Sequence, residues 1–166
     1  MTTTVNDYYE HLTAEIASYC DSNASVTEIE GKSTLSQDAF FSLITEKHFS
    51  GTGELDGGDA NRCFYRSKDK SVAIDGFSCN FEDFSNVLTL IIMDYSFEDK
   101  VASMSKQEAS ILFDRLQRYL TKSIQSGYGA KFESTTEEGQ LAKNIAARWA
   151  DIMQVRLILL TNRLLS

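Results

Sequence analysis

The sequence has no proline, three cysteines, two histidines and no long apolar run. A membrane-spanning helix needs roughly 18 consecutive apolar residues, so no contact with a membrane is expected. Cys20, Cys63 and Cys79 are odd in number and far apart in the chain, which argues against a disulfide framework and against a zinc site of the CxxC type. Together these absences predict a cytoplasmic protein.

Basic residues are also scarce relative to acidic ones. The chain has 16 Lys and Arg against 24 Asp and Glu, a net charge of -8. Proteins that bind nucleic acid on their own usually carry a basic surplus, because neutralising phosphates supplies most of their affinity. Nucleic acid would therefore be a partner only through a local basic patch, a divalent metal or a second domain.

The 166 residues are enough for one domain, which we assign to 1–166. The last predicted strand is followed by the apolar pair Leu164-Leu165. Because chain ends tend to be exposed and polar, this pattern favours the N-terminal part of a longer chain.

Hydrophobic periodicity predicts four helices and four strands. Helices are expected over 4–20, over 37–49, from the capping box Ser105–Glu108 to Gly127, and from a second box at Thr135–Glu138 to Gln154. Strands are expected over 62–66, 72–78, 87–95 and 155–161. The glycine-rich segment 50–60 lacks the Lys and Ser/Thr of a phosphate-binding loop and is interpreted as a linker.

The order of these elements predicts the fold class. Three closely spaced strands favour an antiparallel meander, and the helices that follow lead to a fourth strand. The expected architecture is α/β, a mixed four-stranded sheet of αβββαβ order flanked by helices. The restriction-endonuclease-like, or PD-(D/E)XK, nucleases share this order.

Two of the apolar strands each carry one acid, Asp75 on the second and Asp94 on the third. In PD-(D/E)XK nucleases, acids on these strands bind Mg²⁺ and act in catalysis, and a lysine two residues beyond the second acid helps to activate water. Asp75 and Asp94 are therefore the candidate catalytic and metal-binding residues, with Glu46 as a possible third ligand. Ser96 occupies the lysine position, and Lys70 and Lys100 are the nearby substitutes.

A structural role explains the same acids equally well. Asp75 beside Gly76 suits a strand kink at which a carboxylate accepts backbone hydrogen bonds. Asp94 could be the first polar residue where a buried strand reaches the surface.

The segment Ala73-Ile74-Asp75-Gly76-Phe77 and the later Met93-Asp94-Tyr95 resemble the N-terminal domain of AIPR proteins, the abortive-infection phage-resistance proteins of bacteria. The resemblance implies a nuclease-like fold at the start of a longer antiphage protein. It places Asp75 and Asp94 at the acidic positions of the nuclease motif.

Two functions follow as hypotheses. The first is metal-dependent phosphodiester hydrolysis, for which the motif lacks its lysine. The second is a noncatalytic interaction or sensor module that recognises a phage component or docks onto its own chain. An unrelated α/β domain with the same element order is the third alternative.

Overall fold

Four strands form one mixed sheet in the computed structural model, which describes residues 4–22, 32–48, 60–79, 87–125 and 127–166. The strands are β1 (Asn61–Arg66), β2 (Ala73–Ser78), β3 (Val87–Asp94) and β5 (Gln154–Thr161). Their spatial order is β1-β2-β3-β5, with β2 antiparallel to both neighbours and β5 parallel to β3. The mixed α/β sheet is confirmed, and each predicted strand agrees with the structure to within one residue at either end.

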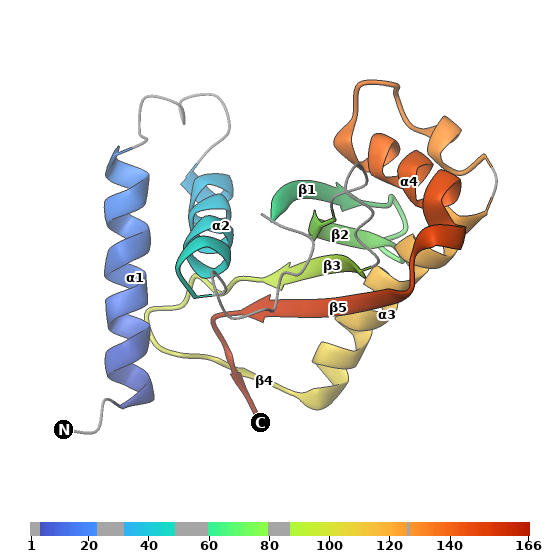
Figure 1. Cartoon of the computed structure of the whole chain (residues 1–166). Helices are drawn as coiled ribbons and strands as arrows, with labels where there is room; N and C mark the ends of the chain where they lie inside the picture. The colour runs from blue at the N-terminus through green and yellow to red at the C-terminus, as the bar shows by residue number, and fades with distance from the viewer. Residues whose placement is uncertain (1–3, 23–31, 49–59, 80–86, 126) are drawn as a thin grey trace.

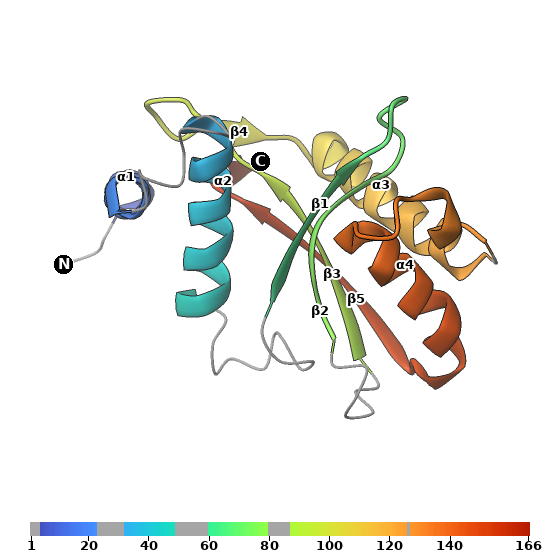
Figure 2. The same cartoon turned by 90° about the horizontal axis from the view of Figure 1, so that it is seen from above.

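The helices lie on both faces of this sheet (Figure 1). They are α1 (Val5–Ser22), α2 (Lys32–Leu43), α3 (Lys106–Ile124) and α4 (Glu137–Arg148). Shorter helical segments are the π-helix η2 (Ile44–His48) and the 3-10 helices η3 (Gly129–Lys131) and η4 (Trp149–Asp151). Figure 2 shows α1 and α2 on one side of the sheet and α3 and α4 on the other.

The bounds of the second and the last predicted helices differ most from the structure. The second helix begins at Lys32 and not at residue 37. The last helix ends at Arg148, because η4 intervenes before β5, and its N-cap is Thr136, whose hydroxyl accepts the Gly139 N–H. The capping box of α3 is confirmed, with Ser105 and Glu108 bonding each other's backbone N–H. Apart from Ala60, the glycine-rich segment lies outside the described residues.

A second, two-stranded sheet pairs β4 (Ser103–Met104) with β6 (Leu164–Leu165) in parallel. The sequence did not predict it, because two residues carry no detectable period. The Leu164 N–H donates to the Ala102 carbonyl, and the Ser166 N–H donates to the Met104 carbonyl. These bonds hold the segment after β5 against the start of α3.

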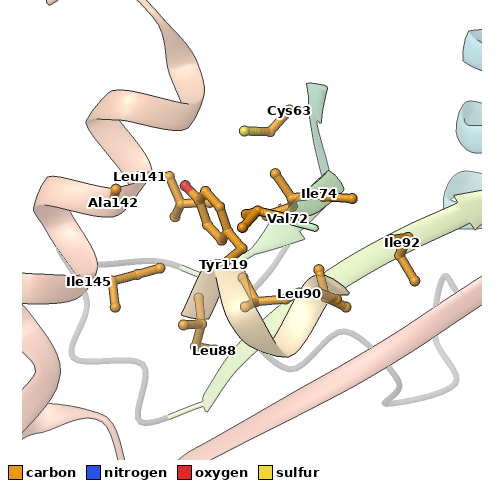
Figure 3. Packing of buried hydrophobic residues seen from close by; sticks show 12 residues of the cluster. Cys63, Val72, Ile74, Leu88, Leu90, Ile92, Tyr119, Leu141, Ala142 and Ile145 are labelled. Carbon is orange, nitrogen blue, oxygen red and sulfur yellow. The ribbon is translucent and has the colours of Figure 1, made fainter. Parts of the chain in front are cut away.

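β3 is the centre of the hydrophobic core, and residues 88–93 are all buried. Leu88, Leu90 and Ile92 face a cluster formed with α3 and α4, shown in Figure 3. Ile91 and Met93 face the opposite cluster, formed with α1 and α2. Continuous apolar character is typical of a strand covered on both faces, as the sequence predicted. No helix in the described ranges combines the length and the apolar character that a bilayer crossing requires.

Candidate functional site

Asp75 lies where the regular hydrogen bonding of β2 is interrupted. The β2–β3 register runs over Gly76–Ser78 only, and the β1–β2 register shifts between Arg62 and Tyr65. One carboxylate oxygen of Asp75 accepts the Met93 N–H of β3 at 2.6 Å. The side chain therefore gives β3 an acceptor at a point where the ladder between the two strands has ended.

Two arginines of β1 hold the same carboxylate. The Arg62 Nη1 is 3.0 Å from Asp75 Oδ1, and the Arg66 Nη2 is 2.8 Å from Oδ2. The same guanidinium groups also donate to the carbonyl oxygens of Asp75 and Ile74, at 2.8 and 2.9 Å. Asp75 is 1% exposed, so almost all of its contacts are with protein atoms.

Arg62 extends this network to α2. Its Nε donates to Asp38 Oδ1 at 2.9 Å, and its guanidinium carbon lies 5.5 Å from the centre of the Phe41 ring. The Phe41 ring also covers Gly76, where an added Cβ would overlap the ring and lie 2.8 Å from the Asn61 carbonyl oxygen. Asp75 and Gly76 thus hold α2 against the sheet, Asp75 through the ion pairs of Arg62 and Gly76 through its close contact with Phe41.

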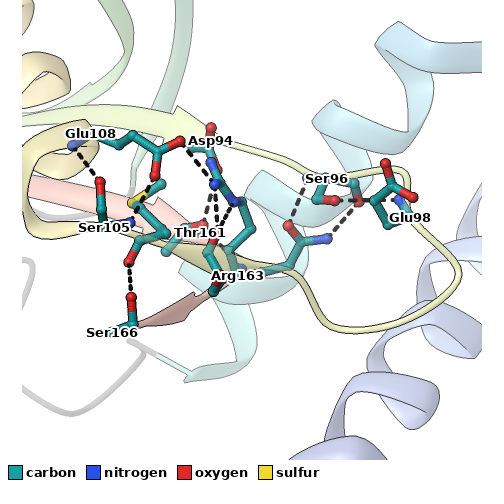
Figure 4. Close-up of polar contacts among 11 residues, drawn as sticks. Asp94, Ser96, Glu98, Ser105, Glu108, Thr161, Arg163 and Ser166 are labelled. Carbon is teal, nitrogen blue, oxygen red and sulfur yellow. Dashed lines mark hydrogen bonds and ion pairs between the residues drawn. The ribbon is translucent and has the colours of Figure 1, made fainter.

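Asp94 belongs to a separate network at the end of β3 (Figure 4). It accepts the Thr161 hydroxyl at 3.2 Å and faces Arg163 Nη1 at 3.4 Å. Arg163 Nη2 is 3.0 Å from Glu108 Oε1 of α3. Because Ile92 faces α3 and Met93 faces α2, strand alternation places Asp94 on the α3 side of the sheet.

Ser96, where the predicted nuclease motif would require a lysine, links the segment after β3 to the segment after β5. Its N–H donates to Asn162 Oδ1 at 2.7 Å, and Asn162 Nδ2 donates to the Ser96 carbonyl at 2.9 Å. Lys70 lies exposed in the β1–β2 turn with a φ of 61°, and Lys100 is exposed between β3 and β4. Glu46 is exposed on η2.

The structure does not bring Asp75, Asp94 and Glu46 together. Asp75 reaches α2 through Arg62, whereas Asp94 reaches α3 through Arg163. Within the described residues, no three His, Cys, Asp or Glu side chains form a group that could hold a metal. Mg²⁺ binds oxygen ligands and water in a near-octahedral arrangement, and two guanidinium groups do not fit beside such a cation. Magnesium binding stays a prediction that this arrangement does not favour.

Cys63 and Cys79 are poor nucleophiles in this structure. Cys63 is buried, and desolvation raises the pKa of its thiol to about 12, so it stays protonated at neutral pH. Burial also raises the pKa of Cys79, which directly follows β2. Both thiols belong to the hydrophobic cluster on the α3 side of the sheet, Cys63 within it and Cys79 packed against it.

Sequence reasoning missed the arginines. Arg62 and Arg66 are four residues apart on one strand, so period-two alternation puts them on the same face. That spacing, on the strand next to one that carries an acid in an apolar run, could have predicted that both arginines contact Asp75. Arg163 gave no such signal, because its partners come from distant parts of the chain.

The family described as the abortive infection phage resistance protein N-terminal domain matches residues 40–166. The chain belongs to this AIPR family. The AIPR match begins in α2 and includes the complete four-stranded sheet, α3 and α4, while α1 lies before it. No curated protein and no solved structure matches the chain. The expected membership is thus confirmed and indicates a phage-defence protein, while the PD-(D/E)XK relationship stays a prediction.

Proposed function

We propose that this domain serves phage defence as a noncatalytic interaction module in which Asp75 and Asp94 stabilise the fold. The observation that carries the proposal is the environment of Asp75. Both of its oxygens are bound by guanidinium groups, one oxygen also accepts the Met93 N–H, and the residue is 1% exposed.

Such an environment suits an anchor better than a metal ligand. A catalytic carboxylate must present a lone pair to a cation or to water, and that requires an accessible oxygen. Here the charge is already neutralised by Arg62 and Arg66, and a cation would have to displace both. Asp94 is 25% exposed, but Arg163 and the Thr161 hydroxyl both contact its Oδ2.

Metal-dependent nuclease activity is the second candidate. The antiparallel meander followed by a parallel strand favours it, because this arrangement is the one expected for a nuclease-like sheet. It requires a rearrangement that frees Asp75 from β1 and brings a second acid beside it.

Asp75→Asn and Arg66→Ala in the full-length protein separate the two functions. Phage plating efficiency, thermal melting and Mg²⁺ calorimetry would be measured for each variant. If Asp75 stabilises the fold, both substitutions should lower the melting temperature and weaken phage protection together. Calorimetry of the parent should then show no heat of Mg²⁺ binding.

Asp114→Asn removes an exposed carboxylate from α3 and serves as the matched control. Magnesium binding by the parent that Asp75→Asn abolishes, at an unchanged melting temperature, would establish the nuclease candidate instead.

A further inference from the structure

β5 has the composition of an interior strand but lies at an edge of the sheet. Its sequence QVRLILLT contributes to both hydrophobic clusters, and β3 is its only neighbour among the described strands (Figure 1). Residues 155–159 are half-buried, whereas their register partners in β3, residues 88–92, are 0% exposed. One more strand beside β5 would cover this remaining apolar surface.

The opposite edge of the sheet is protected. β1 has six residues, contains the register shift, and carries Arg62 and Arg66 around the exposed Phe64. Short length, bulges and charge are the devices by which proteins prevent an edge strand from pairing with another chain. β5 lacks them, because it pairs with β3 over eight consecutive positions without a shift and has Arg156 as its one charged residue.

Exposed apolar side chains lie near both ends of β5. Met153, just before the strand, is 79% exposed, and Trp149 is 37% exposed. Leu164 and Leu165, just after it, are 51% and 57% exposed. In an antiparallel pair the beginning of one strand lies beside the end of the other, so two copies of this edge would bring these groups together at both ends.

We propose that β5 pairs antiparallel with β5 of a second copy of this chain, joining two four-stranded sheets into one. The contact spans about 26 Å, the length of eight residues in a strand. It is isologous, because the same backbone groups and the same apolar side chains serve both copies. This inference is independent of whether the domain is catalytic.

A foreign peptide or another segment of the protein could add a strand through the same backbone bonds. A second copy also accounts for the exposed apolar side chains at the two ends of β5, since it supplies an apolar partner for Met153 at one end and for Leu164 at the other. The occupant we assign is therefore the second copy.

Sedimentation equilibrium of the parent chain and of Leu157→Lys tests the pairing. Leu157 is half-buried, so the lysine stem can stay on the core while its ammonium group reaches solvent beside the edge that no described strand covers. We expect a dimer in the parent and dimerisation weakened about tenfold or more in the variant. Ile111→Lys introduces the same charge at an exposed position of α3 and should leave the dimer intact.

Hydrogen exchange of the parent provides a second measurement that needs no variant. Protection of the β5 amides should rise with protein concentration, while that of β1 stays constant. If Leu157→Lys does not fold by circular dichroism, Met153→Asp at the 79% exposed site replaces it. A parent that remains monomeric at about 100 µM overturns the proposal. So does a dimer in which β5 gains no protection.

Discussion

Replacing Asp75 by asparagine keeps the shape of the side chain and removes the charge that faces Arg62 and Arg66. Removing one partner of a buried ion pair leaves the other uncompensated, so we expect a loss of about 3 kcal/mol in the free energy of unfolding. Asp38→Asn, which removes a 38% exposed partner of Arg62, should cost under about 1 kcal/mol. Urea denaturation measures both, and equal losses would contradict the anchoring role of Asp75.

Gly76 should tolerate no larger side chain. The Cβ of Gly76→Ala would overlap the Phe41 ring and approach the Asn61 carbonyl at 2.8 Å, which predicts a destabilisation of about 1–3 kcal/mol. Combining it with Phe41→Leu should recover part of that loss, because the two sites share one contact. If the two changes in the free energy of unfolding add strictly in the double variant, Phe41 of α2 and Gly76 of β2 are not energetically coupled.

At the scale of elements, the start of α3 should be sensitive to acid. The Ser105 N–H and Arg163 lower the pKa of Glu108 from its ordinary 4.5 to about 2. A carboxylate with a lowered folded-state pKa contributes stability above its unfolded pKa and loses it as the pH falls through the folded value. The melting temperature of the parent should therefore exceed that of Glu108→Gln at pH 7, and the difference should vanish between about pH 4.5 and pH 2.

Asp114→Asn, from the exposed middle of the same helix, is the control for this series. A difference between the parent and Glu108→Gln that persists unchanged at pH 2 would show that the carboxylate acts through its shape and not through its charge.

At the scale of the whole molecule, α1 should open without unfolding the sheet. α1 buries Tyr9, Leu12 and Ile16 in the cluster that it shares with α2, and it lies before the AIPR match. Leu12→Ala should speed amide exchange in α1 and leave β3 protected, since local units can open without global unfolding. Hydrogen exchange followed by mass spectrometry resolves these segments.

Leu116→Ala, in the α3 cluster, is the comparison for Leu12→Ala. Leu116 is 0% exposed, so its truncation should cost about 2–5 kcal/mol and accelerate exchange throughout the sheet. Faster exchange in β3 for both variants would mean that the molecule unfolds as a single unit.

β3 and β5 could be predicted from the sequence because they are dense apolar runs, and β1 and β2 because turn-forming residues separate short runs that favour strands. The direction in which the side chains of Asp75 and Asp94 point, and the residues they contact, could not be predicted. The environment of Asp75 depends on a register shift between β1 and β2 and on arginines 9 and 13 residues away, and periodicity carries neither. Asp94 was correctly placed at the end of β3, but its contact with Arg163 depends on a turn that sequence patterns do not define.

The parallel pairing of β3 with β5 also sets an order on how the chain can fold. β1, β2 and β3 are near neighbours in the sequence, whereas Asp94 and its partner Thr161 are 67 residues apart. Closing so long a loop costs chain entropy before any contact repays it, and such non-local pairings slow folding. During synthesis, α3 and α4 leave the ribosome before β5 does. The edge of β3 that pairs with β5 therefore stays unpaired, and accessible to chaperones, until β5 has been made.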